Sequence, residues 1–195
     1  MVALRKRLPV RMDVQEFLAW DAQELSGRRW ELRDGRPVLM APASERHGAI
    51  QSELARLLGN HIAAVKPGCR VITAPGVVPH VRSDENFRIP DLGVTCAPPS
   101  GSVMTRDPVL LIEILSPGNE ARTRSNIWTY TTIPSVREIL AVHSTKMKVE
   151  LLRREPDGNW PAMVSIVRPP ELLTLHSLDF AVPVIDVYRT AGLEI

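Results

Sequence analysis

The segment Val109–Leu115 reads Val-Leu-Leu-Ile-Glu-Ile-Leu, so that one carboxylate, Glu113, interrupts an otherwise continuous apolar run. Such a run is typical of a central β-strand that is covered on both faces. An isolated charge is costly in that setting, and Glu113 therefore needs a partner, a metal ion or a proton. One interpretation is an ion pair with a nearby arginine at a strand edge. The apolar context favours the other, in which Glu113 belongs to a functional site.

The chain is long enough for one hydrophobic core and has an ordinary composition. It has 195 residues, of which 44% are hydrophobic and 24% charged, as in soluble globular proteins. No apolar run reaches the roughly 20 residues of a membrane helix. The basic start of the chain, Met1–Met12, lacks the apolar segment of a secretory signal. We expect a cytoplasmic protein with a single domain over 1–195, a core at about 13–190 and a basic tail at 1–12.

Cysteine content and net charge point to no special chemistry. Cys69 and Cys96 have no metal-ligand spacing, and we expect two buried free thiols in a reducing compartment rather than a redox pair. The 24 basic and 22 acidic residues give a net charge of +2, which is too small to indicate nucleic-acid binding by itself. Solvated surface is the favoured role of the basic tail and of Arg122–Arg124, and contact with phosphates is the alternative.

Two local patterns near the start of the chain are specific. Asp13 can cap a helix, and Glu16 follows three residues later, as in a capping box. Asp34-Gly35 is a strong signal for a β-hairpin. Alternation along the first strand of this hairpin places Glu31 and Arg33 on the face opposite to the apolar one.

The rest of the chain mixes helical and strand patterns without strict βαβ order. Helical spacing of apolar residues runs over 44–65 and a second helix is expected over 119–132. The strand candidates are 69–73, 92–96, 109–115, 138–143 and 148–153, and 184–188 is a short helix at best. This mixture predicts an α/β (α+β) fold with one mixed β-sheet flanked by helices.

Carboxylates on separate segments suggest a metal site. Asp91 follows Pro90, which stiffens the start of a strand, and Glu31 lies on the hairpin. If these acids lay beside Glu113, each close pair would repel by about 4 kcal/mol at a surface-like dielectric. Mg²⁺ or Mn²⁺, which prefer hard oxygen ligands, would offset that repulsion.

Five short motifs occur in an order that resembles the Uma-two family, whose members are expected to be endonucleases. They are Glu31-Leu-Arg-Asp-Gly, His47-Gly, Arg88-Ile-Pro-Asp-Leu, Ile112-Glu-Ile-Leu-Ser-Pro and Ile133-Pro-Ser-Val-Arg-Glu. Each motif is weak alone, but five in register are strong. The similarity extends from about Asp13 to Tyr188, and it implies the restriction-endonuclease-like fold of the PD-(D/E)xK type.

The resemblance also implies a chemistry. Asp91 and Glu113 would be the metal-binding acids, with Glu31 as an additional carboxylate beside them. Mg²⁺ or Mn²⁺ held there would support hydrolysis of DNA phosphodiester bonds, in which a water of lowered pKa attacks in line. A homodimer is compatible with the resemblance, because two copies of this fold often cut the two strands of a duplex, but the residues themselves do not indicate one.

The sequence departs from this family at the site lysine. The residue two positions after Glu113 is Leu115, and in most relatives the lysine lies instead on the next helix, four residues before a tyrosine. Here that position is Asn126, before Tyr130. Arg122, one turn earlier on the same face, is permanently protonated and suits a transition-state clamp rather than a general base. The alternatives are therefore a catalytically degenerate protein that binds nucleic acid or a protein partner, and a structural dimer without a site.

Histidine and aromatic residues near these positions leave further questions. His47 begins the long helix, which Ser44 can cap. It could transfer a proton or contact a phosphate, or it could belong only to the surface. Trp128 and Tyr130 are expected in a core or an interface rather than in a platform that stacks on bases.

Overall fold

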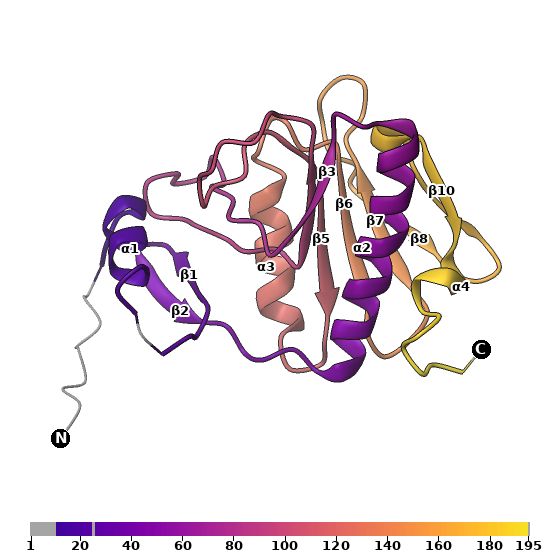
Figure 1. The fold of residues 1–195 in the computed structure, drawn as a ribbon, viewed down its shortest axis with the longest axis horizontal. Helices are drawn as coiled ribbons and strands as arrows, with labels where there is room; N and C mark the ends of the chain where they lie inside the picture. Colours follow the sequence, from indigo (N-terminus) through magenta and orange to yellow (C-terminus); the bar gives the residue numbers. More distant parts are fainter. Residues whose placement is uncertain (1–10, 25, 195) are drawn as a thin grey trace.

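The computed structural model describes residues 11–24 and 26–194, so most of the basic tail lies outside the described residues. Its centre is a six-stranded mixed sheet (Figure 1). In order across the sheet, the strands are β3 (Arg70–Thr73), β4 (Leu92–Thr95), β5 (Pro108–Leu115), β6 (Glu138–His143), β7 (Val149–Arg153) and β8 (Ser165–Val167). β5 and β6 are parallel, and the other neighbours are antiparallel.

Helices cover both faces of this sheet (Figure 1). The long helix α2 (Glu45–Val65) packs on one face, and α3 (Glu120–Tyr130) packs on the other. Successive side chains of a strand point to opposite faces. Leu110, Ile112 and Ile114 accordingly join the core with α2, whereas Leu111 and Leu115 join the core with α3. Glu113, in the same alternation, faces α3.

The amino-terminal elements lie beside α3 (Figure 1). α1 (Val14–Asp21) begins with the predicted capping box, and β1 (Trp30–Arg33) pairs with β2 (Arg36–Leu39) around the predicted turn. Asp34 and Gly35 have φ values of 47° and 77°, as the two central residues of a type I′ turn require. Phe17, Leu32 and Phe87 form the small core that fixes this hairpin.

The predicted elements are confirmed within one or two residues, but the end of the chain contains more structure than the sequence indicated. Residues 165–183 form β8, β9 (Leu172–Leu175), the 3₁₀ turn η1 (His176–Leu178) and β10 (Phe180–Pro183) before α4 (Val184–Val187). These strands have only three or four residues, too few for a periodic pattern to be recognised. Within the described residues, no helix is both long and apolar enough to cross a membrane.

The prediction of two free thiols is wrong, because Cys69 and Cys96 form a disulfide. β3 and β4 are antiparallel, and Arg70 pairs with Thr95. The residue before Arg70 and the residue after Thr95 therefore lie opposite each other. This register depends on which strands are neighbours, and the spacing of the cysteines in the sequence does not reveal it.

Candidate active site

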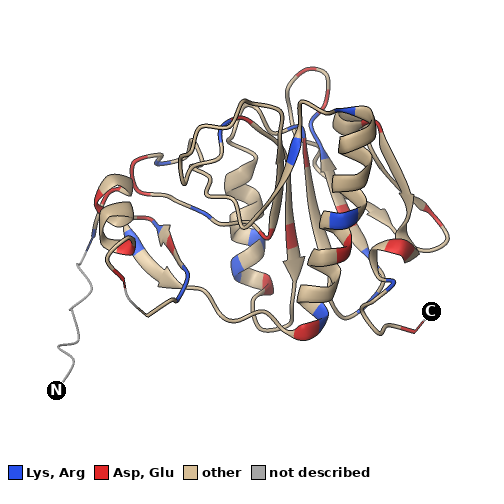
Figure 2. Ribbon diagram, in the orientation of Figure 1, with Lys and Arg blue, Asp and Glu red and all other residues tan. Residues whose placement is uncertain are grey.

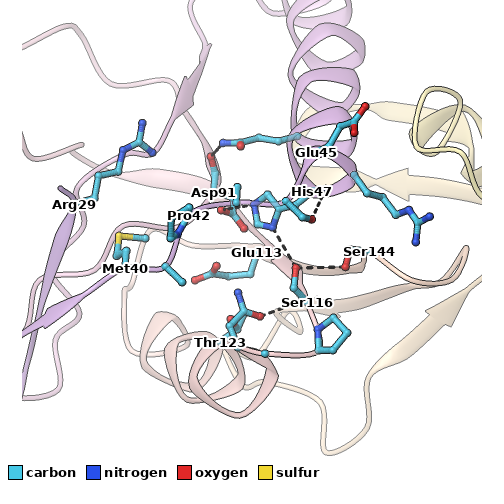
Figure 3. Close-up of a pocket in the computed structure, with 18 of the residues that line it drawn as sticks. Arg29, Met40, Pro42, Glu45, His47, Asp91, Glu113, Ser116, Thr123 and Ser144 are labelled. Carbon is cyan, nitrogen blue, oxygen red and sulfur yellow. Dashed lines mark hydrogen bonds and ion pairs between the residues drawn. The ribbon is translucent and has the colours of Figure 1, made fainter. Parts of the chain in front are cut away.

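A pocket with a volume of about 1390 Å³ lies where the hairpin, the start of α2, the end of β5 and the first turns of α3 come together (Figure 3). All of the predicted site residues line it: Glu31, Asp91, Glu113, Arg122 and Asn126. The fold thus brings together side chains from segments that are far apart in the sequence.

Asp91, just before β4, is held by contacts of its side chain and by hydrogen bonds to its backbone oxygen, one of them from the backbone N–H of Ala74 over 3.0 Å. Oδ2 of Asp91 accepts a hydrogen bond of 2.7 Å from the backbone N–H of Ile114, and its Oδ1 lies 3.0 Å from Nε2 of His47. The side-chain amide of Gln51 donates to its backbone oxygen over 2.7 Å. The side chain is 18% exposed, so that the carboxylate is fixed against β5 and α2 and still reaches the pocket.

Glu113 is buried, and its carboxyl group bonds to α3. Its Oε1 accepts hydrogen bonds from the hydroxyl of Tyr130 at 2.6 Å and from Nδ2 of Asn126 at 3.2 Å. Oε2 has no hydrogen bond to any described residue. The alternative of a strand-edge ion pair is not confirmed, because β5 is an interior strand of the sheet and Glu113 forms no salt bridge in the described part of the chain.

Electrostatics at this position favour a cation. Burial raises the pKa of Glu113 well above its usual range, and the negative charges of Asp91 and then Glu31 raise it further, against the hydrogen bonds from Tyr130 and Asn126. Burial likewise raises the pKa of the Tyr130 hydroxyl well above its usual range. Mg²⁺ in proteins is typically bound by one or two carboxylates together with substrate phosphates. Asp91 and Glu113, with the free Oε2, therefore fit a divalent cation.

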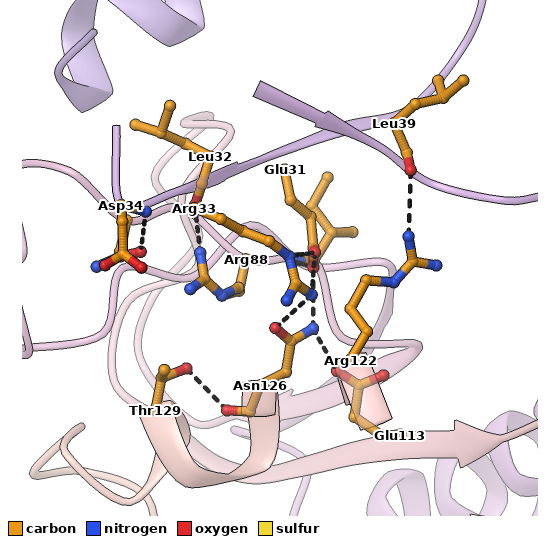
Figure 4. A network of polar contacts seen from close by, with 12 residues as sticks. Glu31, Leu32, Arg33, Asp34, Leu39, Arg88, Glu113, Arg122, Asn126 and Thr129 are labelled. Carbon is orange, nitrogen blue, oxygen red and sulfur yellow. Dashed lines mark hydrogen bonds and ion pairs between the residues drawn. The ribbon is translucent and has the colours of Figure 1, made fainter. Parts of the chain in front are cut away.

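Both carboxylate oxygens of Glu31 accept hydrogen bonds within the site. Its Oε2 accepts hydrogen bonds from Nε and Nη2 of Arg33 at 3.0 and 2.7 Å, and its Oε1 accepts from the backbone N–H of Ile89 and from Asn126, both at 3.1 Å (Figure 4). Among the described residues, no three His, Cys, Asp or Glu side chains form a group that could hold a metal ion. The role of Glu31 as an additional carboxylate beside Asp91 and Glu113 stays a prediction, and in this structure its two oxygens accept from Arg33, Ile89 and Asn126.

Asn126, at the position that the resemblance assigns to the family lysine, stands beside Glu113. Its Nδ2 donates to both Glu31 and Glu113, and its Oδ1 accepts a hydrogen bond of 2.7 Å from Nη2 of Arg33 (Figure 4). One amide thus connects two carboxylates and one guanidinium group. Residue 126 is therefore neutral, but its side chain contacts the positively charged guanidinium group of Arg33.

Arg122 lies in the wall of the pocket, away from this network. Its Nη1 donates to the backbone oxygen of Leu39 over 3.2 Å (Figure 4), and within residues 11–24 and 26–194 it contacts no carboxylate. Arg122 can meet an anion that enters the pocket. It does not take the place beside Glu113 that the sequence offered as an alternative.

Two residues are more closely involved than the sequence indicated. His47 is buried and contacts Asp91, so that a role at the surface alone is excluded; its Nδ1 lies 3.5 Å from Oγ of Ser116. Arg33 was placed on the same strand face as Glu31 by alternation but was not assigned to the site. The signal for Arg33 existed, because an arginine two residues from a buried carboxylate on one strand face is an obvious partner.

Comparisons with known proteins agree with this architecture. A family model described as "Uma2: Putative restriction endonuclease" matches residues 14–184. An uncharacterized protein of Synechocystis sp. is 27% identical over 182 residues, which are 92% of each chain. The crystal structure of "a putative nuclease" from Anabaena variabilis superposes with a TM-score of 0.72 at 16% identity, over 94% of this chain and 99% of that one. At that identity the last comparison shows the fold alone, and it confirms the predicted fold class.

Proposed function

Because this chain belongs to the Uma2 (Uma-two) family, we propose that it is a nuclease that hydrolyses DNA phosphodiester bonds with the help of Mg²⁺ or Mn²⁺. The observation that carries the proposal is the placement of Asp91 and Glu113 in one pocket, with a raised pKa on Glu113. Two neighbouring acids of which one is buried are disfavoured without a cation. In a metal-dependent nuclease, both acids would serve as ligands of the ion.

Asp91, Glu113 and His47 would have distinct roles in this reaction. Asp91 and Glu113 would hold the ion, which when bound polarises the phosphate and lowers the pKa of a water. In the hydrolysis a bond forms between the water oxygen and phosphorus, the bond to the leaving oxygen breaks, and the proton that the water loses is balanced by one gained by the leaving oxygen. His47, hydrogen-bonded to Asp91, fixes the orientation of that carboxylate.

Charge around the pocket supports an anionic substrate. The rim carries the arginines Arg28, Arg29, Arg46 and Arg122 and one exposed acid, Glu45, whereas Glu31 and Glu113 are buried. Phosphates beside the scissile bond would meet the arginines while the scissile phosphate meets the bound ion. A polymer with regularly spaced phosphates matches such an arrangement better than a small neutral substrate does.

The test is a cleavage assay with single- and double-stranded DNA in the presence of Mn²⁺. We expect the wild-type protein to cleave and Asp91→Ala to lose activity by about 100-fold or more, as expected when a metal ligand is removed. The matched control is Asp84→Ala, because Asp84 is an exposed aspartate on the same loop whose side chain makes no hydrogen bond within the described residues. The proposal is wrong if the wild type does not cleave or if both variants cleave equally.

A second candidate is a degenerate member of the family that binds nucleic acid or a protein partner. The observation in its favour is Asn126, a neutral residue at the position of the family lysine. Calorimetry with Mg²⁺ and Mn²⁺ separates the two candidates. A degenerate site would bind metal weakly or not at all, and DNA affinity would then be the same with metal and with EDTA.

Three properties suggested by the sequence remain predictions. They are a single domain over the whole chain, a homodimer and a location in the cytoplasm. Light scattering during size-exclusion chromatography would test the dimer. Limited proteolysis would test the single domain, since one core should be cut only near the ends of the chain.

A further inference from the structure

We propose that Arg33 supplies the positive charge of this site and acts through Asn126, which is the member of the pair that faces the pocket. The inference rests on the proposed function and deepens it. Arg33 does not line the pocket, whereas Glu31, Glu113 and Asn126 do. Arg33 is therefore a positioning residue that lies behind the reacting groups.

The contacts of Arg33 are specific. Its Nη2 is shared between Oε2 of Glu31 and Oδ1 of Asn126, at 2.7 Å from each. The Arg33 side chain is 16% exposed and that of Glu31 is 3% exposed. Charged hydrogen bonds that are shielded from water in this way are stronger and better fixed than surface pairs. Arg33 thus neutralises Glu31 and leaves Asp91 and Glu113 as the acids available to a cation.

The chemistry of the asparagine amide explains why residue 126 is neutral. A guanidinium group only donates hydrogen bonds and a carboxylate only accepts them. With Arg33 on one side, the amide must turn its oxygen toward Arg33 and its NH₂ toward Glu31 and Glu113. A lysine at 126 could not accept from Arg33 and would place a second cation beside the guanidinium. An aspartate could accept from Arg33 but could not donate to Glu113.

This orientation also presents Glu113 to the pocket. Nδ2 of Asn126 and the hydroxyl of Tyr130 both bond to Oε1 of Glu113. The other oxygen, Oε2, is left for a ligand. When Arg33 is removed, the Asn126 amide loses the contact that fixes its rotation, and Glu113 loses one of the two donors that orient it.

Other arginines near the pocket do not have this connection. Arg122 donates to the backbone oxygen of Leu39, and Arg88 donates to the backbone oxygen of Leu32 (Figure 4). Within the part of the chain that the structure describes, neither makes a hydrogen bond to a carboxylate of the pocket. Arg33 is the arginine whose contacts lead to Glu113.

The test is a double-mutant cycle with Arg33→Met, Asn126→Lys and the combination of both. Steady-state cleavage with Mn²⁺ gives kcat and KM, and calorimetry gives the Mn²⁺ affinity. We expect each single variant to lower kcat by about 10-fold or more with KM within about threefold of wild type, and to change the Mn²⁺ affinity, because the charge and hydrogen bonds around Glu113 change. The double variant should recover to within about threefold of wild-type kcat, because one cation again stands beside the carboxylates.

The matched control is Arg36→Met, since Arg36 is exposed and pairs directly with Arg33 across the hairpin. It should leave kcat and KM unchanged. A double variant whose loss equals the product of the two single losses would overturn the proposal, and so would an Arg33→Met protein with wild-type kcat.

A further variant, Asn126→Asp, keeps the acceptor for Arg33 and removes the donor to Glu113. If Arg33→Met fails to fold, unchanged kcat in Asn126→Asp overturns the proposal and lowered kcat supports it.

The two proposals fail in different ways. If the wild-type protein does not cleave DNA, the proposed function is wrong, and the same cycle is then measured on the thermal midpoint. A midpoint that is lowered in Asn126→Lys and restored in the double variant still supports the coupling of Arg33 to Asn126. Additive midpoints overturn it whatever the protein does to DNA.

Discussion

At the scale of single residues, Glu113 has a pH dependence of known sign. Burial, Asp91 and Glu31 raise its pKa, so the folded protein binds this proton more tightly than the unfolded chain does. Its effect on stability is therefore most favourable below the usual carboxyl range, and stability is lost as the pH rises from that range through the raised pKa. We predict that Glu113→Gln, which keeps the shape without the charge, has a higher thermal midpoint than the wild type at neutral pH in EDTA.

The measurement is a set of thermal denaturation curves from acidic to slightly alkaline pH. The advantage of Glu113→Gln should disappear at low pH, where the wild-type carboxyl group is protonated as well. Mn²⁺ should raise the midpoint of the wild type and not that of the variant, because a ligand stabilises only the protein that binds it. A variant that is less stable than the wild type at all pH values would contradict the raised pKa.

How far the site could be predicted also depends on single residues. Glu113 was recognisable because a charge within an apolar strand demands an explanation, whereas Asn126 followed from the resemblance to a family whose lysine lies four residues before a tyrosine. The bond between Arg33 and Asn126 joins residues 93 positions apart. No periodicity specifies which face of a helix meets which hairpin, so that only the packed structure could reveal it.

At the scale of elements, the buried carboxylate of Glu53 links α2 to the segment that follows α4. Glu53 on α2 bonds to Arg56 over 2.5 Å and to Arg189, after α4, over 3.0 Å. The hydrogen bond from Arg56 is the main cause that lowers the pKa of Glu53 to about 2. The stabilisation is thus present above the usual carboxyl range, near about 4.3, and is lost as the pH falls toward the lowered pKa.

We predict that Glu53→Gln removes this part of the acid dependence. Thermal midpoints of wild type and variant should differ most near neutral pH and converge as the pH approaches the lowered pKa of Glu53. The control is Glu45→Gln, an exposed glutamate at the start of α2 whose side chain makes no hydrogen bond in the described residues. A constant difference at every pH would mean that Glu53 contributes packing rather than charge.

The elements that could be predicted are those with a strong period or a specific turn. The 44–65 helix and the Asp34-Gly35 hairpin are of this kind, and both are confirmed. β8, β9 and β10 are too short to carry such a signal. The disulfide between Cys69 and Cys96 was missed for a different reason, since it depends on the antiparallel pairing of β3 with β4.

At the scale of the whole molecule, the net charge of +2 conceals a local arrangement. Figure 2 shows acidic and basic residues interspersed along the chain rather than gathered in one element. The lining of the pocket nevertheless combines the arginines Arg28, Arg29, Arg46 and Arg122 with the buried carboxylates of Glu31 and Glu113. If the substrate is DNA, affinity should depend on these few arginines and on the salt concentration, because each cation that contacts a phosphate releases a counterion.

We therefore predict that Arg28→Ala and Arg29→Ala each weaken DNA binding, while Arg168→Ala does not. All three arginines are exposed, but Arg168 lies outside the pocket, beyond β8. Binding is best measured by fluorescence anisotropy in EDTA at several salt concentrations, so that cleavage does not interfere. Each rim variant should reduce the slope of log affinity against log salt by about one unit. Equal salt slopes in the wild type and all three variants would show that DNA does not contact the arginines of this rim. The acids of the pocket would then act on another substrate.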